Sequence, residues 1–399
     1  MLQIIRTYWH FLGIGWRIHR RAKKWRKDHH DYVQGRIEKV PFPAIVQIIP
    51  TEHCNLRCGM CNQWGDKGYF LAGERKAAQM PIDKLIEFLE HYRSISPDFT
   101  LSIHGGEPFL YRHLDQLLDY IAKRKIDTLF STNGTLLDRF ASKLALINSH
   151  TFYLLSIDGG EEANDRIRGE GITEKIKHSA DALKVECKKL KVGNPKFIVN
   201  YCLSEHNPDA VDDVAKVAKQ VGATFVNYNL RWFMPEEKGL AYDQMLEQEF
   251  QARPTHAWRG WVVDKPFEAT IEQAIDRVYD KMKWFHYLKG PPFFTMIPKF
   301  LSRQQAKTFY HEYEELFGIK SCIMPSYWAR IHSSGELIYC PGHPDIVPGN
   351  VFESPFEEVY HNAVSNKLRK KVEKELMPIC NRCCGLYMTY TATRLIDEK

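Results

Sequence analysis

The feature that most constrains this chain is a regular alternation of short apolar segments with longer amphipathic segments between residues 44 and 230. The short segments are rich in apolar or β-branched residues and are bounded by turn formers, which is typical of strands. They are Ala44–Ile49, Thr100–His104, Asp127–Ser131, Phe152–Ile157, Phe197–Leu203 and Thr224–Leu230. The helical segments between them are Ile82–Tyr92, Leu114–Lys123, Asp138–Leu146, Glu174–Leu190 and Pro208–Gln220. Because parallel strands need crossover connections, the pattern predicts an α/β fold, a partial (β/α)6 TIM-like barrel with helices outside.

Three cysteines follow the first predicted strand. Cys54, Cys58 and Cys61 lie within eight residues, at the strand end where barrel enzymes place their active sites. Cysteine is a soft ligand that suits zinc or iron–sulfur clusters. A structural zinc site usually draws four ligands, often as two separated pairs. A cubane cluster offers four irons, so three cysteines leave one iron open for chemistry.

Small and polar residues occupy the tips of the next three predicted strands. Gly105 and Gly106 precede Glu107 after the second strand, and two successive glycines let a backbone approach a ligand closely. The third strand ends at Ser131 and Asn133, and the fourth ends at Ser156 and Asp158. Taken alone, each of these motifs is also ordinary turn chemistry.

In this order, the Cys-x3-Cys-x2-Cys spacing and the strand-tip motifs resemble the radical S-adenosylmethionine (SAM) enzymes. The resemblance implies that Cys54, Cys58 and Cys61 ligate a [4Fe–4S] cluster whose open iron binds SAM. One electron, from a donor such as flavodoxin or ferredoxin, would cleave SAM to a 5′-deoxyadenosyl radical that abstracts hydrogen from a substrate C–H bond. The resemblance implies SAM contacts for Met60, Gly105, Gly106, Glu107, Ser131, Asn133, Ser156, Asp158 and Arg168. Met60 stands where family members often carry an aromatic residue beside the adenine, and a thioether can also pack against a ring.

A second group of cysteines lies near the C-terminus. The pattern Cys322-x12-Gly335-x4-Cys340 resembles the opening of a SPASM or twitch auxiliary-cluster domain. That resemblance implies a hairpin over Ile331–Tyr339 that turns at Gly335, and a return segment that begins at Gly349. The ligands available for a second [4Fe–4S] cluster are Cys322, Cys340, Cys380 and Cys383, with Cys384 as an alternative to Cys383. Four thiolates fill one cubane, and a structural zinc is the alternative for this site.

A fully ligated second cluster favours electron transfer, so the predicted reaction is oxidation or cross-linking of a peptide. The alternative is a dehydrogenase or epimerase acting on a small sugar or polyol. Cys202, in the fifth predicted strand, is the candidate hydrogen-donating thiol for epimerisation, although most free cysteines are small buried hydrophobes.

Two interpretations outside enzymology are a pure iron–sulfur electron carrier and a zinc protein that binds nucleic acid. A carrier needs no glycine-rich SAM pocket. The net charge is +6, but residues 1–40 hold ten Lys or Arg against three Asp or Glu, so the rest sums to −1. A nucleic-acid binder spreads basic residues along a face, and we therefore expect no nucleic-acid partner.

The basic N-terminal segment has two interpretations. Apolar residues recur there at helical spacing, at Ile5, Tyr8, Trp9, Leu12 and Trp16. One interpretation is a helix that caps the main domain while its charges stay solvated. The other is a helix that contacts an anionic membrane surface through residues 1–27. The chain has no apolar run of about 18 residues and no signal-peptide pattern, so we expect a cytoplasmic protein, peripheral to the membrane if the second interpretation holds.

The expected domains are a basic amphipathic segment at 1–42, the radical SAM barrel at 43–235, a helical aromatic-rich insertion at 236–318, and the auxiliary-cluster domain at 319–399. The aromatic residues of residues 231–318 are expected mainly in packing. Arg231, beside the sixth strand tip, is the charged residue there expected to face the site.

Overall fold

The structure is a computed structural model that describes residues 2–73, 76–263 and 267–389, with the side chains of 2–12, 284, 285 and 287 left out. Its centre is a sheet with the strand order β7-β6-β5-β4-β3-β2-β1-β8-β9. The strands are β1 (Ile45–Thr51), β2 (Thr100–Gly105), β3 (Thr128–Thr132), β4 (Thr151–Ser156), β5 (Phe197–Leu203), β6 (Phe225–Leu230), β7 (Phe293–Ile297), β8 (Trp328–Ile331) and β9 (Leu337–Ile338). Neighbouring strands are parallel except for the antiparallel pair β8–β9. The fold class is therefore confirmed as a partial α/β barrel.

The six strands predicted from the sequence are β1 to β6, with bounds within two residues of the prediction. The helical interpretation of residues 236–318 is wrong at β7, which pairs with β6 from Phe225↔Phe293 onward. This segment is short, apolar and preceded by Pro291-Pro292, the same features that predict a strand elsewhere. The predicted domain bounds stay predictions, because one sheet runs through three of the four segments.

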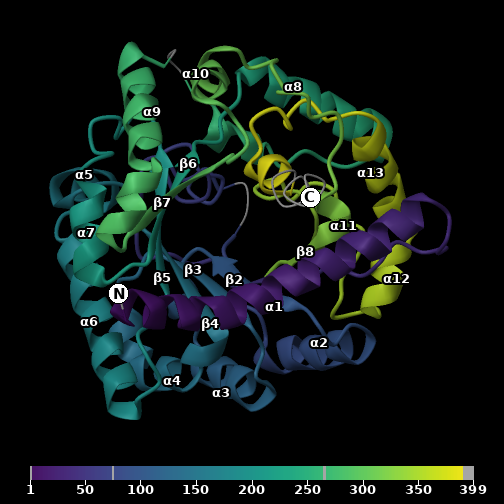
Figure 1. Cartoon of the computed structure of the whole chain (residues 1–399). Helices are drawn as coiled ribbons and strands as arrows, with labels where there is room; N and C mark the ends of the chain where they lie inside the picture. Colours follow the sequence, from purple (N-terminus) through teal and green to yellow (C-terminus); the bar gives the residue numbers. More distant parts are fainter. Residues whose placement is uncertain (1, 74–75, 264–266, 390–399) are drawn as a thin grey trace.

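Helices surround the sheet on its outer side (Figure 1). They are α2 (Ile82–Ile95), α3 (Leu114–Arg124), α4 (Ala141–Leu146), α5 (Glu161–Arg168), α6 (Ile172–Leu190), α7 (Val214–Val221), α8 (Glu236–Met245), α9 (Ala269–Lys281), α10 (Arg303–His311), α11 (Met324–Tyr327), α12 (Phe356–His361) and α13 (Ala363–Lys374). The helix predicted over Pro208–Gln220 begins only at Val214, and that over Asp138–Leu146 is split into a 3-10 turn, Leu137–Phe140, and α4. Helix α5, which carries Arg168, was not predicted.

The core lies between the sheet and these helices. Along β5, Phe197, Val199 and Tyr201 are buried, while Asn200 and Cys202 keep part of their surface accessible. Because side chains alternate across a strand, the buried set packs outward into the core and the other set faces the barrel interior. The same alternation in β3 exposes Leu129 and Ser131 to the interior, so polar side chains are carried inside the barrel.

The predicted C-terminal hairpin is confirmed and joins the barrel sheet. Arg330 pairs with Ile338 across β8 and β9, and the turn places Gly335 at a φ of +90°, which favours glycine. The amide of Leu337 donates to the carbonyl of Gly349 at 3.0 Å, which is the predicted return segment. On its other side β8 runs parallel to β1, so the auxiliary cysteines are fixed to the barrel edge.

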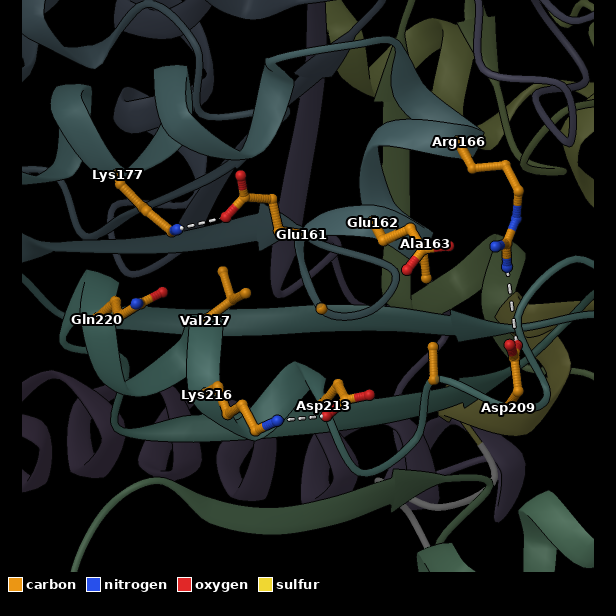
Figure 2. Close-up of a pocket in the computed structure, with 12 residues that line it drawn as sticks. Glu161, Glu162, Ala163, Arg166, Lys177, Asp209, Asp213, Lys216, Val217 and Gln220 are labelled. Carbon is orange, nitrogen blue, oxygen red and sulfur yellow. Dashed lines mark hydrogen bonds and ion pairs between the residues drawn. The ribbon is translucent and has the colours of Figure 1, made fainter.

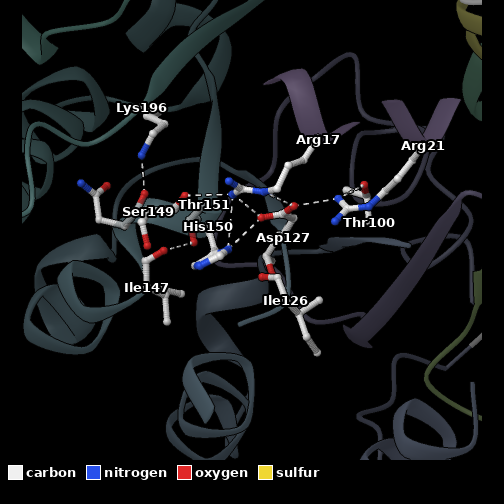
Figure 3. Close-up of polar contacts among 12 residues, drawn as sticks. Arg17, Arg21, Thr100, Ile126, Asp127, Ile147, Ser149, His150, Thr151 and Lys196 are labelled. Atoms are coloured by element: carbon white, nitrogen blue, oxygen red, sulfur yellow. Dashed lines mark hydrogen bonds and ion pairs between the residues drawn. The ribbon is translucent and has the colours of Figure 1, made fainter. Parts of the chain in front are cut away.

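Helix α1 (Leu2–Val33) crosses the end of the barrel where the strands begin (Figure 1). Two residues of this helix, Ile14 and Trp25, are buried. Arg17 and Arg21 pair with Asp127 at 2.6 and 2.8 Å, and His150 lies 2.9 Å from the same carboxylate (Figure 3).

The expected capping role of the N-terminal helix fits these contacts, but the charges of Arg17 and Arg21 are paired, not solvated. Trp16 does not lie on a buried stripe, because it is 60% exposed and stacks with Arg20. The side chains of Ile5, Tyr8, Trp9 and Leu12 lie outside the described residues. None of the helices in the described part of the chain is long and apolar enough to span a bilayer.

Candidate active site

The three-cysteine loop follows β1 and presents thiols that are all partly accessible. The amide of Leu56 points to Cys54 Sγ at 3.5 Å and that of Trp64 points to Cys61 Sγ at 3.5 Å. Such amide contacts favour the thiolate form that binds iron. Burial raises the pKa of Cys54 to about 12 and also raises that of Cys58, so thiolates here require a cation such as iron.

The turn after β2 packs against the backbone that leads into this loop. The amides of Gly106 and Glu107 donate to the carbonyls of Thr51 and His53 at 3.1 and 2.8 Å. A Cβ on Gly105 would lie 2.1 Å from the Thr51 oxygen, and one on Gly106 would lie 2.3 Å from the His53 oxygen. Only glycine permits this approach, so both glycines fix the position of the cysteine loop.

Glu107 joins this turn to the tip of β3. Its buried carboxylate accepts from Thr132 Oγ1 at 2.7 Å and from the amides of Asn133 and Phe109 at 2.8 and 3.1 Å. Burial raises the pKa of Glu107 to about 7. Asn133 Nδ2 in turn donates to Asn55 Oδ1 at 2.9 Å. These contacts give Glu107 and Asn133 a structural role, and their contacts with SAM stay predictions.

Arg168 reaches the cysteine loop from α5. Its guanidinium pairs with Asp158 Oδ2 at 2.5 Å and lies 3.7 Å from Cys58 Sγ. Burial opposes the charge, but Asp158 and Cys58 outweigh it and raise the pKa of Arg168. A fixed cation therefore lies beside the thiol that is predicted to ligate the cluster, as expected for an anion-binding residue.

The other predicted site residues lie on strands β3 to β5, in the three-cysteine loop and after β6. Ser131 and Ser156 lie on partly accessible positions of β3 and β4, while Met60 is 9% exposed. Cys202 is on the interior face of β5, and its amide donates to Asp158 Oδ1 at 2.9 Å. Arg231 lies next to the end of β6 and pairs with Glu205. The structure thus links Cys202 to Asp158 and Arg168.

Several residues near this site were not identified from the sequence. Asn55, inside the cysteine loop, bonds to Asn133 and Thr135. Arg57 stacks on Trp64 with 4.3 Å to the ring centroid, and Trp64 Nε1 donates to the Glu52 carbonyl at 2.8 Å. Their only signal in the sequence is their proximity to Cys54–Cys61, which does not single them out.

The auxiliary cysteines form a second group beyond β8. Cys322 and Cys380 are buried, and the charges of Cys322 and Cys340 add to burial in raising the pKa of Cys380. Cys383 follows one turn after Cys380, with its amide donating to the Cys380 carbonyl at 3.0 Å. The donors fit a cluster with four thiolate ligands. The choice between Cys383 and Cys384 stays a prediction.

Within the described residues, no three Cys, His, Asp or Glu side chains lie close enough to hold a single metal ion. Each cysteine of a cubane binds a different iron, so a cluster does not need them to converge on one point. A groove of about 310 Å³ lies among α5, α6 and α7 (Figure 2). Its lining residues include no cysteine, and its basic residues pair with acidic ones: Lys177 with Glu161, Arg166 with Asp209 and Lys216 with Asp213.

An open parallel barrel, three cysteines at its first strand tip and a second cysteine set at its edge define an iron–sulfur enzyme. Residues 48–218 match the radical SAM superfamily, and residues 322–384 match the SPASM iron–sulfur cluster-binding domain. The chain belongs to the radical SAM superfamily and carries a SPASM domain. Its cofactors are therefore SAM, a [4Fe–4S] cluster and auxiliary iron–sulfur clusters.

Similar proteins include an AdoMet-dependent heme synthase of Methanosarcina barkeri, 25% identical over 86% of this chain and 88% of the relative. The mycofactocin maturase MftC of Mycobacterium ulcerans is 24% identical over 84% of this chain and 78% of MftC.

Among solved structures, Streptococcus suis SuiB bound to its precursor peptide SuiA has a TM-score of 0.58 at 17% identity, covering 92% of this chain and 76% of SuiB. The structure of anSMEcpe with AdoMet and a peptide has a TM-score of 0.55 at 16% identity, covering 90% of this chain and 99% of that one. These two structures share the fold.

Proposed function

We propose that this enzyme oxidises or cross-links a peptide. When bound, the [4Fe–4S] cluster supplies the electron that cleaves SAM to methionine and a 5′-deoxyadenosyl radical. The single observation that carries the proposal is that the partly accessible thiols of the three-cysteine loop lie at the same strand ends as the polar interior positions of β3 to β5. A substrate in the barrel interior would therefore reach the radical.

The chain's own residues would hold and orient SAM. Arg168 would pair with the methionine carboxylate, and Gly105 and Gly106 would bring their backbone close to the methionine amino group. Ser131 and Ser156 offer hydroxyls toward the interior. Met60 would pack beside the adenine. We propose an external reductant, such as flavodoxin or ferredoxin, as the source of the electron.

The proposed oxidation removes two electrons and two protons from the substrate in total. One hydrogen atom leaves the substrate carbon for 5′-deoxyadenosine. The substrate radical would then lose one electron and one proton. Cys322, Cys340, Cys380 and Cys383 would hold the auxiliary cluster, which would supply the electron acceptor. The result is an unsaturated or cross-linked product. A peptide substrate is supported by relatives, because SuiB was solved with a precursor peptide and MftC is a maturase.

Anaerobic reconstitution tests the enzyme proposal. We expect about eight irons per chain, four for each cubane, and conversion of SAM to methionine and 5′-deoxyadenosine under reduction. Zinc bound at either cysteine group, or intact SAM with both clusters reduced, would contradict it. Incubation with candidate precursor peptides, read by a mass loss of two hydrogens, then tests the reaction type.

Epimerisation of a small sugar or polyol is the second candidate, and Cys202 favours it. Hydrogen-atom donation needs an S–H group, and burial raises the pKa of Cys202 to about 12, which keeps the thiol protonated. The test is turnover in D₂O, where a thiol donor leaves one deuterium in an epimerised product. Product formation at the normal rate by Cys202→Ala would reject this role.

We also propose that α1 contacts an anionic membrane surface. Arg20, Lys23, Lys24 and Lys27 are exposed on the helix that also carries the exposed Trp16. Vesicles containing anionic lipid should sediment the intact protein, and replacing these four basic residues with Gln should release it. Equal sedimentation of both proteins would contradict the proposal.

A further inference from the structure

Four side chains whose polar atoms are buried meet between the two cysteine groups. This donor cluster consists of Asn62, Trp232, Trp261 and His343. Asn62 directly follows Cys61, and His343 lies three residues after Cys340. The two tryptophans come from the segments that follow β6 and α8. Segments that are far apart in the sequence thus converge at one place between the two cysteine groups.

The geometry of the donor cluster is compact. Trp232 and Trp261 stack with ring centroids 4.4 Å apart, and the His343 ring lies 5.1 Å from Trp232 at 67°. A Cβ built on Gly342 would lie 3.1 Å from both Asn62 Nδ2 and Trp261 Nε1. The amide of Asn62 and the indole N–H of Trp261 therefore converge on the same point beside Gly342.

The polar atoms of the donor cluster have no partner among the described residues. These atoms are Asn62 Nδ2, the Nε1 atoms of Trp232 and Trp261, and both ring nitrogens of His343. Asn62, Trp232 and His343 are 7%, 4% and 1% exposed. A buried donor without a partner is destabilising because it has lost its hydrogen bonds to water, so a ligand that accepts from these groups would stabilise the holoenzyme.

The surroundings of the donor cluster favour a negative ligand. The cation of Arg330 lies close enough to His343 to act on its ring electrostatically. Arg330 donates to Gln47 Oε1 at 2.5 Å, and no described carboxylate forms an ion pair with it. The carboxylate of Asp345, two residues from His343, already accepts from Thr255 and Tyr242.

We propose that the donor cluster binds a carboxylate of the substrate and holds it between the two cysteine groups. Indole and amide N–H groups can donate to carboxylate oxygens, and charge-assisted hydrogen bonds are stronger than neutral ones. This inference rests on the proposed function, because it assigns the substrate group that the barrel interior would hold. It adds that the substrate carries a carboxylate close to its reacting carbon.

The test uses reconstituted holoenzyme labelled with 5-fluorotryptophan, whose resonances are assigned by Trp→Phe variants. The two probes are N-acetylglycine, which has a carboxylate, and N-acetylglycinamide, which is its neutral analogue. We expect N-acetylglycine to shift the Trp232 and Trp261 resonances and to bind about tenfold more tightly than the amide, the factor for one stronger hydrogen bond. Trp258 is the internal control, because its N–H already donates to Asp243 at 3.0 Å.

Variants complete the test. Asn62→Leu should weaken binding of N-acetylglycine about tenfold by removing one donor, while Trp258→Phe should leave it unchanged. An unshifted Trp258 resonance and full iron content in Asn62→Leu show that the variant is folded. Equal affinity for both probes, no shift with either, or equal shifts at Trp258 would overturn the proposal. Cleavage of SAM, measured separately, reports on the proposed function and is independent of these shifts.

Discussion

The two cysteine groups of this protein are built in different ways. In the first group, called here the polar group, Cys54, Cys58 and Cys61 are all partly accessible, and the guanidinium of Arg168 lies 3.7 Å from Cys58 Sγ. In the second group, called here the enclosed group, Cys322 and Cys380 are 9% and 7% exposed and belong to the apolar core, while Cys340 and Cys383 are partly accessible. The difference teaches that the first group leaves all of its thiols partly accessible, whereas the second encloses two of its four. This division fits SAM binding at the first group and electron acceptance at the second.

The largest effect should follow from removing a thiol of the polar group. Cys58→Ala should reduce SAM cleavage to background, because Cys58 is a predicted ligand of the iron–sulfur cluster that binds SAM. Production of 5′-deoxyadenosine by the reduced enzyme measures this. Cys187→Ala is the matched control, since Cys187 is a buried helix residue far from both groups in sequence. Cleavage by Cys58→Ala at the normal rate would remove the distinction between the two groups.

Removing a thiol of the enclosed group should separate SAM cleavage from oxidation of the substrate. Cys380→Ala should lower the iron content from about eight to about four per chain, while SAM cleavage continues. Formation of the oxidised product should stop, because the substrate radical has lost its electron acceptor. Iron analysis together with product mass spectrometry measures both effects. Loss of SAM cleavage in proportion to iron would mean that the two groups are not independent.

A smaller effect is expected at Arg168, which links the polar group to SAM. Arg168→Ala should raise the KM for SAM by about tenfold to a hundredfold, the range for losing a hydrogen bond to a charged group. The control is Arg166→Ala on the same helix, because Arg166 lies 3.7 Å from Asp209 on the surface. Initial rates over a range of SAM concentrations distinguish the two variants. An unchanged KM in Arg168→Ala would exclude the carboxylate contact.

The buried carboxylate of Glu107 should stabilise the fold around the polar group. Glu107→Leu leaves three donors without an acceptor, so the free energy of unfolding should fall by about 2–4 kcal/mol. Anaerobic urea unfolding of the holoenzyme measures this loss. Glu87→Leu, at an exposed carboxylate on α2, should change it by less than about 0.5 kcal/mol. Equal stability of the two variants would mean that the hydrogen bonds of Glu107 contribute nothing.

The same carboxyl group should also make stability depend on pH. The pKa of Glu107 is raised from 4.5 to about 7 by burial, so the folded protein holds this proton more tightly than the unfolded chain. The contribution of the Glu107 proton to the free energy of unfolding is therefore complete below pH 4.5 and is lost as the pH rises through about 7. Glu107→Gln should flatten this decline in unfolding experiments between these pH values, and an unchanged slope would contradict it.

The sequence predicted most of what is local in this protein. The strands β1 to β6 follow from short apolar periods and turn formers, and β5 was predicted with its observed bounds, Phe197–Leu203. The three-cysteine loop was recognised because its spacing is short. The C-terminal cysteines and the hairpin at Gly335 were predicted because Cys322-x12-Gly335-x4-Cys340 resembles the opening of a SPASM domain. In each case the signal lies within one segment of the chain.

The missed features depend on contacts between distant segments. The hydrogen bond from Arg330 to Gln47 spans 283 positions, and no local pattern marks either residue. The donor cluster combines Asn62 with Trp232, Trp261 and His343, which come from four separate segments of the chain. Trp16 was placed on a buried stripe because helical spacing alone does not tell which side meets the protein.

The most direct test of the division between the two groups is electron–nuclear double resonance on the reduced enzyme with SAM labelled by ¹⁵N at its amino group. We predict nitrogen coupling to one cluster only, which persists in Cys380→Ala and disappears in Cys58→Ala. Coupling that survives in Cys58→Ala and disappears in Cys380→Ala would place SAM at the enclosed group and contradict the account.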